Sequence, residues 1–460
     1  MAIQNFPSAL QPIIQQGFLE REFEEALRSH IGYRMIADRE QFATGIGETL
    51  TKTRRGLKAP VTTPLSASSN TNLDNGLTSS TFSVEQYSLT LNQYADTIDL
   101  NMVTNRVGIV SQFLQNAKVN GVQAAQSLDR LARNALFNPY FGGNTRVRTT
   151  LGSAGTTISV DDIRGFQYVF GTTTPTGIAS SSTGQSPTQL AVSGTNTLSV
   201  VVGSNTYTLT GAAADGTNVS TAPNGISGTL TFSSNVSVAD GTAGNSVAAA
   251  NASVIIRPSG RGNTSLLQAT DTFTMQNILD AVATLRLNNV PGVDGGEGAT
   301  ADGLYNLYLD PKSARQLFAD PDFKQLFQGA TSASQVFQRG MTNDFLGVRF
   351  MPTTEAFTQT LSGVGTVRRP ILVGQGALVE GDYAGMMEAD IAPNNAIMAM
   401  VDGIVQVTRE PLDRLQQIIA QSWYWIGGFT APSDITTNTT IVPTATNAAY
   451  KRAVMIEHIG

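Results

Sequence analysis

Helical periodicity marks two segments in the first third of the chain. Between residues 10 and 31, apolar side chains recur every four or five positions with glutamates among them, which predicts an amphipathic helix that lies on another surface. A longer pattern steps by three and four from Val107 to Leu136, with Thr104 at an N-cap position and Asn138-Pro139 as the expected stop. At 1.5 Å per residue, this second helix would be about 45–50 Å long.

Alternating apolar positions predict strands in two regions that follow one another along the chain. Residues 82–100 read as one long strand or a pair of strands. Residues 145–265 carry many short alternating runs separated by Gly, Asn and Asp, and residues 171–260 contain only three charged side chains. This second region predicts an all-β sandwich or barrel, with low-complexity disorder as the alternative. Within it, "SVVVGSNTYTLTG" predicts a hairpin that turns at Gly203-Ser204-Asn205.

The last 200 residues mix both patterns. The segment 272–290 predicts a helix with Ile278, Ala281, Leu285 and Leu287 on one face. The other expected elements are a strand over 304–310, one helix over 311–327 that begins with Pro311, a strand region over 368–382, two strands around a charged turn after Ala396, and a short strand at the C-terminus.

The segment 45–83 is rich in Ser, Thr and Asn and is punctuated by prolines. Its composition fits a disordered linker, and its β-permissive flanks fit an extended two-stranded arm that needs a neighbouring surface. Arg54, Arg55 and Lys58 form a small basic cluster on it. We expect this cluster to contact carboxylates of a neighbouring subunit; nucleic acid is the weaker alternative, because no aromatic residues interleave with the cluster.

The amino-acid composition excludes several functional classes. Only 14% of residues are charged, about half of the usual share, which suggests that much of the surface meets protein. The net charge of −6 gives no field that favours nucleic acid, and the absence of cysteine excludes disulfides and thiolate chemistry. The length allows two to four domains. No apolar run spans a membrane and no signal peptide is visible, so we expect a cytoplasmic origin.

The sequence offers no catalytic motif. The two histidines, His30 and His458, are far apart, and we expect each to be a surface or packing residue. No Gly-Lys pair of a phosphate-binding loop occurs. Asp320 and Asp322 could form a carboxylate pair, but their position around Pro321 favours capping or breaking of helix turns. We therefore predict no catalytic, cofactor-binding or metal-binding residues.

The order of these parts resembles the major capsid proteins of tailed bacteriophages, which have the Hong Kong 97 fold that encapsulins share. The resemblance rests on the long helix "RVGIVSQFLQNAKVNGVQAAQSLDRLARNALFNPYF", on "LYNLYLDPKSARQLFADPDFKQLF" and on "PILVGQGALVEGDYAG". It covers residues 1–145 and 265–460, and each motif is weak by itself. The implied class is α+β: the tailed-phage capsid fold with an inserted all-β domain.

The resemblance also implies a division of the chain and a function. The chain would build an icosahedral shell around double-stranded DNA, without catalysis or cofactors. It would assemble in a bacterial cytoplasm as hexamers and pentamers. Its expected partners are a scaffolding protein, a portal and a decoration or minor capsid protein, and it would touch DNA non-specifically at most. Alternatives are an encapsulin-like shell, a β-rich surface adhesin or a carbohydrate hydrolase. The implied parts are an N-terminal helical arm (1–44), an extended loop (45–83), a peripheral-domain strand and spine helix (84–144), the inserted β domain (145–265), an axial domain (266–395) and returning peripheral strands (396–460).

Contacts between subunits are expected from both extended parts of the chain. Some family members crosslink a lysine of the loop to an asparagine of a neighbour; Lys52 and Lys58 lie in that segment, but no specific motif accompanies them and we do not predict the crosslink. We also expect the N-terminal segment to be kept rather than removed by a maturation protease. The candidate contact residues are Arg54, Arg55 and Lys58 in the loop, and Phe18, Phe23 and Leu27 in the arm.

Overall fold

The computed structural model divides into two compact units. Unit 1 contains residues 1–51, 88–135 and 378–430, and unit 2 contains residues 52–87, 136–377 and 431–460. None of the described helices is long and apolar enough to cross a membrane. The structure describes residues 32–42, 49–55, 84–101, 112–173, 186–216, 226–250, 252–262, 264–293, 303–328, 344–345, 347–361, 365–383, 398–409, 418–433 and 450–460.

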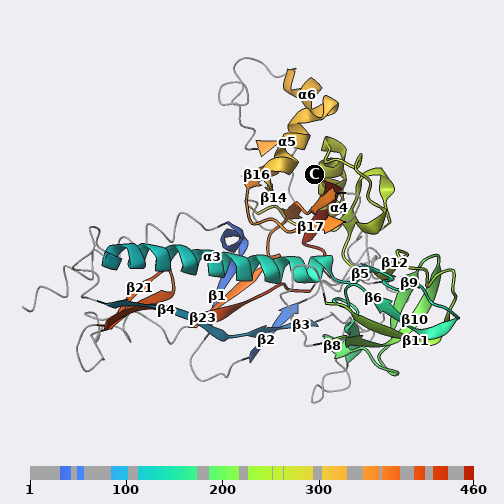
Figure 1. Ribbon diagram of the computed structural model, residues 1–460, viewed down its shortest axis with the longest axis horizontal. Helices are drawn as coiled ribbons and strands as arrows, with labels where there is room; N and C mark the ends of the chain where they lie inside the picture. Colours follow the sequence, from blue (N-terminus) through green and yellow to red (C-terminus); the bar gives the residue numbers. More distant parts are fainter. Residues whose placement is uncertain are drawn as a thin grey trace, which may run out of the picture. The chain divides into compact units, whose positions relative to one another are not determined.

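A six-stranded sheet forms the body of unit 1 (Figure 1). Its central strand is β23, which pairs with β4 along one edge and with β22 and β20 along the other. β21 extends the sheet beyond β22, and β1 adds in parallel to β20. The strands are β1 (Asp38–Phe42), β4 (Asn92–Asn101), β20 (Val379–Tyr383), β21 (Met398–Val401), β22 (Ile404–Arg409) and β23 (Ile418–Thr430).

The helix α3 (Gln112–Phe141) follows one face of this sheet (Figure 1). Its Ala124 and Leu128 pack with Trp423 and Trp425 of β23 in one apolar cluster. The predicted helix is confirmed over the residues described, but the expected stop at Asn138-Pro139 is wrong. Pro139 lies in the last turn, where the amide of Gly142 still donates to the carbonyl of Asn138 at 3.1 Å. Pro139 has no amide hydrogen and so cannot bond to the carbonyl of Ala135, but the helix continues for two residues beyond it.

The segment after Ala396 forms three strands where we expected two. Asp402 and Gly403 both have positive φ, at 51° and 79°, and they form a two-residue turn between β21 and β22. Asp-Gly is a favoured pair for such a turn because both positions require the left-handed region. The turn divides what the apolar pattern indicated to be one strand.

Residues 49–90 contribute a two-stranded ribbon, β2 (Thr49–Arg55) with β3 (Val84–Thr90). β3 and β4 together confirm that residues 82–100 contain a pair of strands. The pairing of β2 with β3 agrees with the two-stranded alternative for the extended segment. Its middle, residues 56–83, lies outside the described residues.

Unit 2 contains a closed antiparallel barrel of six strands. The order is β5-β12-β9-β10-β11-β6, and a bridge between Val147 and Val160 joins the chain after β5 to β6. Fifteen buried apolar residues fill its interior. The region is thus a barrel rather than a sandwich. Its strands are β5 (Asn144–Arg146), β6 (Gly155–Val160), β9 (Leu198–Val202), β10 (Asn205–Ala214), β11 (Gly228–Val236) and β12 (Ser246–Ala249); β7 (Tyr168–Thr173) and β8 (Ser186–Ala191) form a separate pair.

The predicted hairpin β9–β10 turns over two residues, because Asn205 already pairs with Val202. Gly203 has φ 60°, and a Cβ atom there would lie 2.7 Å from the Oδ1 atom of Asp240. The Asp240 carboxylate accepts hydrogen bonds from the side chains of Asn205, Tyr207 and Ser237 at 2.7–2.8 Å, which lower its pKa to about 2. One of the few charges in this region thus fixes the hairpin turn.

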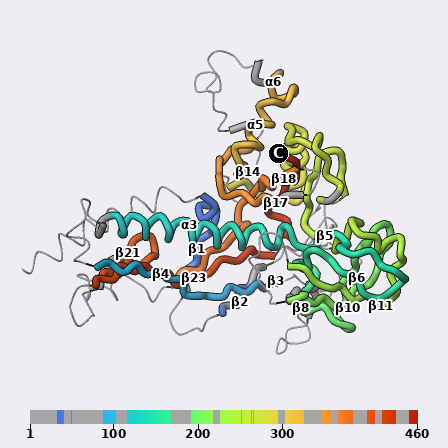
Figure 2. Tube along the Cα trace, in the orientation of Figure 1, coloured from blue at the N-terminus to red at the C-terminus, as the bar shows by residue number. Residues whose placement is uncertain are grey.

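A second and a third sheet and three helices lie beside the barrel in the sequence of unit 2 and form most of its remaining described elements. The strand order of the second sheet is β13-β24-β19-β14-β16-β15, and the smaller third sheet has the order β17-β18-β25. The C-terminal residues form two buried strands, β24 (Ala453–Ile456) and β25 (His458–Ile459), where we expected one; Figure 2 shows this red segment among the orange strands. The other elements are β13 (Ile255–Ile256), β14 (Tyr305–Leu309), β15 (Asp344–Phe345), β16 (Val348–Pro352), β17 (Thr358–Leu361), β18 (Gly365–Arg368), β19 (Ile371–Val373), α4 (Met275–Leu287), α5 (Pro311–Ala319) and α6 (Pro321–Gln328).

Asp320 explains why two helices, α5 and α6, replace the single helix expected over 311–327. It ends α5 in an extended conformation before Pro321, and its carboxylate accepts hydrogen bonds from the amides of Met275 and Asp322 at 2.7 and 3.3 Å. The capping role expected for this residue is confirmed. The face predicted for α4 is wrong at Leu287, which is 62% exposed at the last residue of the helix.

Candidate functional site

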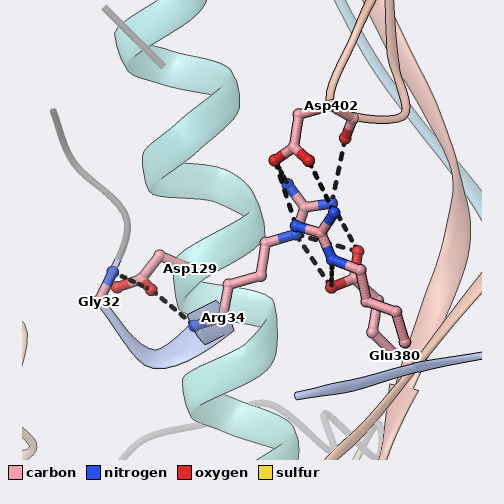
Figure 3. A network of polar contacts seen from close by, with 6 residues as sticks. Gly32, Arg34, Asp129, Glu380 and Asp402 are labelled. Carbon is pink, nitrogen blue, oxygen red and sulfur yellow. Dashed lines mark hydrogen bonds and ion pairs between the residues drawn. The ribbon is translucent and has the colours of Figure 1, made fainter. Parts of the chain in front are cut away.

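Residues 32–36 bind to α3 through backbone amides. The Asp129 carboxylate on α3 accepts hydrogen bonds from the amides of Gly32 at 2.9 Å and Arg34 at 3.1 Å (Figure 3). The 3₁₀ turn η1 (Tyr33–Ile36) directs both amides toward the helix. Burial raises the pKa of Asp129, against the opposing effect of these amides.

The side chain of Arg34 reaches the sheet from this turn. Its Nε lies 3.0 Å from Glu380 Oε1 on β20, and its Nη1 lies 3.1 Å from Asp402 Oδ2 in the β21–β22 turn. Arg34 is 2% exposed and Glu380 is fully buried. Arg39 on β1, which is 52% exposed, adds a second ion pair to Asp402 at 2.7 Å, and this hydrogen bond raises the pKa of Arg39. Two cations thus balance two carboxylates within one network (Figure 3).

This network, which we call the arm root (Gly32, Arg34, Asp129, Glu380 and Asp402), joins α3 to two parts of the sheet. Arg34, together with the neighbouring Arg39, pairs with Glu380 and Asp402, whereas Asp129 is bound by backbone amides, so the arm root has the features of a buried structural network. It fixes the chain directly after residues 1–31. No local sequence pattern pointed to it, because Arg34 and Glu380 are 346 residues apart.

The contact residues predicted from sequence do not form a site in the described residues. Arg54 and Arg55 lie at the end of β2 in the ribbon. Lys58 of the extended segment lies outside the described residues. So do Phe18, Phe23 and Leu27 of the predicted N-terminal helix.

His458 contacts a serine, which tests the expectation that no hydrolytic site exists. Its Nε2 lies 2.7 Å from Ser313 Oγ, and the serine hydroxyl also bonds the Asp310 carboxylate. The carboxylate contacts the serine rather than the imidazole, so it does not orient a general base as in a catalytic triad. All three residues are buried. The arrangement therefore joins the start of α5 to the C-terminal strand, and His458 is a packing residue.

Acid should destabilise unit 2 through His458. Burial lowers its pKa to about 4, so the unfolded chain takes up a proton between pH 6.5 and pH 4 that the folded chain does not. Lowering the pH from 7 to 5 should reduce the free energy of unfolding by about 2 kcal/mol. Urea denaturation at both pH values measures this loss. In His458→Gln the loss should be much smaller, and an equal loss in that variant would assign the effect to other groups.

Comparisons with known proteins agree with this architecture. Residues 210–381 match a family model described as phage capsid protein. The solved capsid of Ralstonia phage GP4 is similar in fold, with a TM-score of 0.50 and 11% identity over 94% of this chain and 92% of that chain. Part of the chain thus matches a phage capsid family model, and the fold is similar to that of a solved phage capsid. The capsids of Helicobacter pylori bacteriophage KHP30 (TM-score 0.43, 8% identity, 94% and 91% covered) and Cyanophage Pam1 (0.45, 12%, 95% and 92%) are also similar. No curated protein sequence matches the chain.

The similarity to the solved capsid confirms the predicted α+β capsid fold. The matched range begins within β10 and includes β11 and β12, so the capsid family model covers the second half of the barrel. In the described residues, no group of three His, Asp or Glu side chains is placed to hold a metal ion. The division into six parts, and the status of the barrel as an insertion, stay predictions.

Proposed function

We propose that this capsid protein is the major subunit of an icosahedral shell that encloses the double-stranded DNA of a tailed bacteriophage. The observation that carries the proposal is the agreement of the family model with the fold of a solved phage capsid. Copies of the chain assemble as hexamers and pentamers in the bacterial cytoplasm. A scaffolding protein, a portal and a decoration protein assist them, and packaged DNA is touched without sequence preference.

The mechanism is the burial of surface between subunits. The β2–β3 ribbon is a pair of strands that belongs to no larger sheet in the described residues. A two-stranded ribbon is marginally stable alone, so a neighbouring subunit would stabilise it. The arm root holds the point from which residues 1–31 start, and the helix predicted there would lie on another copy. Obligate interfaces begin at roughly 2,000 Å², and we expect the overlap of both segments with neighbouring subunits to exceed that area.

Electron microscopy of the chain, expressed alone and with its scaffold, tests the proposal. Closed shells tens of nanometres across are the expected result. A dispersed monomer under both conditions would contradict it, as would a hydrolytic activity that purifies with that monomer.

Deleting Arg54–Asn72 should leave a folded subunit that makes no stable shells. The deletion removes the end of β2 and the connection beyond it, whereas the apolar clusters of the barrel and of the second sheet lie elsewhere. Circular dichroism and thermal unfolding check the fold, and sedimentation checks assembly. As a control, exchanging Arg54 and Arg55 for lysine and Lys58 for arginine keeps the charges and should keep assembly. Normal shells from the deletion variant would show that the extended segment is not the contact.

A further inference from the structure

The chain enters and leaves the barrel at neighbouring points. β5 and β12, its first and last strands, pair with each other, and the amide of Ala249 in β12 donates to the carbonyl of Gly143, directly before β5, at 2.8 Å. The side chain of Asn144 also donates to the carbonyl of Ser253, after β12, at 3.2 Å. The barrel is thus connected to the rest of unit 2 through two adjacent stretches of chain, and the contacts around them decide how freely it can swing.

Three glycines lie at these connections. Neighbouring glycines such as Gly142 and Gly143 ordinarily let a chain bend, because glycine has the widest choice of backbone angles. Here they allow close packing instead. A Cβ atom on Gly165 would lie 2.1 Å from the Gly143 nitrogen, and one on Gly142 would lie 3.2 Å from the Cα atom of Gly165. The Gly143 amide also donates to the carbonyl of Arg164 at 2.7 Å, so the segment after β6 packs directly against the first connection.

Side chains tie the same segment to the end of α3. The Arg164 guanidinium pairs with Asp162 at 2.6 Å, and its Nη1 donates to the side chain of Asn138 in the last turn of α3 at 2.8 Å. It also lies 5.6 Å from the ring centroid of Phe141, the last residue of α3. Arg369, between β18 and β19, lies over the same ring at 4.7 Å. The ring is thus held by one cation from the barrel side and one from the sheet side.

The second connection is fixed by Ser253, which is 4% exposed. Its hydroxyl lies 3.4 Å from the carbonyl of Pro139 in α3 and 3.2 Å from the carbonyl of Tyr450, shortly before β24. The ring of Tyr450 packs edge-on against that of Tyr140, with 5.9 Å between the centroids. The chain that leaves the barrel therefore contacts both the end of α3 and the C-terminal segment.

We propose that Gly142, Gly143, Arg164, Gly165 and Ser253 form a rigid joint, here called the barrel joint, which holds the barrel at one fixed angle to the second and third sheets of unit 2. A barrel on flexible connections would sample many directions, and any molecule that binds it would have to restrict that motion. A rigid joint removes this entropic cost and gives every copy of the barrel the same direction. The uniform direction in a shell rests on the proposed function, whereas the rigidity belongs to the single subunit.

Gly165→Ala tests the barrel joint in the free subunit. Gly165 has φ 81°, which alanine adopts only with strain, and the added methyl group would displace the Gly143 backbone. Hydrogen exchange of the Gly143 and Ala249 amides should become about tenfold faster, because both bonds lie at the joint, while amides that pair inside the barrel keep their protection. Gly194→Ala is the control: nothing lies within 4 Å of its Cβ position, so exchange should stay unchanged.

A pair of spin labels measures the swing of the barrel directly. Because the chain has no cysteine, Ser199→Cys on the barrel and Lys312→Cys on α5, both at exposed positions, can be labelled without other changes. Electron–electron double resonance should give one narrow distance distribution in the labelled subunit and one about twice as broad when Gly165→Ala is added. Ser253→Ala, which alters no glycine, should also broaden the distribution and provides the comparison if Gly165→Ala does not fold.

A distance distribution that is already broad without a joint substitution overturns the proposal. An unchanged width in Gly165→Ala does so too, or in Ser253→Ala if the first variant is unfolded. In shells, electron cryomicroscopy should resolve the wild-type barrel as clearly as the second and third sheets, and Gly165→Ala should blur the barrel alone. A wild type that forms no shells contradicts the proposed function and leaves the spin-label result unaffected.

Discussion

Arg34→Met is expected to destabilise unit 1 by about 3 kcal/mol and to abolish shells, because it leaves the buried Glu380 carboxylate with only the exposed Arg39, 3.7 Å away, as a cation. Arg34 and Glu380 are 2% and 0% exposed, and Nη2 of the arginine lies 2.5 Å from Oε1 of the glutamate. Methionine keeps the unbranched apolar stem of the side chain and removes the guanidinium group, so the loss reports the charge together with its hydrogen bonds. Urea denaturation followed by the fluorescence of Trp423 and Trp425, the only tryptophans, measures the change directly in unit 1.

Arg39→Met is the matched control for this experiment. Arg39 bonds the same Asp402 carboxylate, but it is 52% exposed and faces solvent. Exposed ion pairs contribute up to about 1 kcal/mol, so this variant should stay close to wild type. A second comparison is Arg34→Met/Glu380→Gln, which should recover part of the stability because no isolated charge remains buried. If Arg34→Met and Arg39→Met cost the same, the arm root does not hold the N-terminal segment by its buried charge.

The arm root also shows what could not be predicted from the sequence. The periodicity of α3 and α4 and the short runs of the barrel are local, so their patterns identified them. The Asp402-Gly403 turn was local too and could have been found, because Asp-Gly between apolar runs is a known hairpin signal. The pairing of Arg34 with Glu380 has no local pattern, since these residues come together only when β1 adds to β20. The pairing order of the strands therefore decides which distant charged residues are buried together.

The same reasoning explains the C-terminal strands. The apolar run near residue 455 predicted one short strand, whereas the structure places β24 between β13 and β19 and pairs β25 with β18. The sequence pattern showed that the segment is apolar, but not that it completes two sheets. His458 and Glu457, polar residues that sequence reasoning left at the chain end, are both fully buried there. A polar residue buried in the core needs hydrogen-bond or ion-pair partners, and these come from segments that only the folded chain brings together.

Glu457→Gln is the second substitution expected to have a large effect, with a loss of about 3–5 kcal/mol in the free energy of unfolding of unit 2. The Glu457 carboxylate is fully buried and accepts hydrogen bonds from Arg257 at 2.7 Å and Arg369 at 2.9 Å. Arg369 also lies over the ring of Phe141, with 4.7 Å to the ring centroid. Glutamine keeps the shape of the side chain but removes the negative charge that both buried guanidinium groups bind.

The pH dependence of unfolding provides an independent measurement of the ion-pair cluster that Glu457 forms with Arg257 and Arg369. Although burial opposes ionisation, the two arginines lower the pKa of Glu457 from its usual value to about 2. Because the folded pKa is depressed, the contribution of Glu457 is complete well above pH 4.5 and is lost as the pH falls toward 2. Wild type should therefore lose about 3 kcal/mol over this range that Glu457→Gln does not lose. Asp215→Asn, which breaks the exposed pair with Arg148, is the matched control and should keep the wild-type acid dependence. An unchanged acid dependence in Glu457→Gln would show that this ion-pair cluster does not anchor the C-terminal strands by charge.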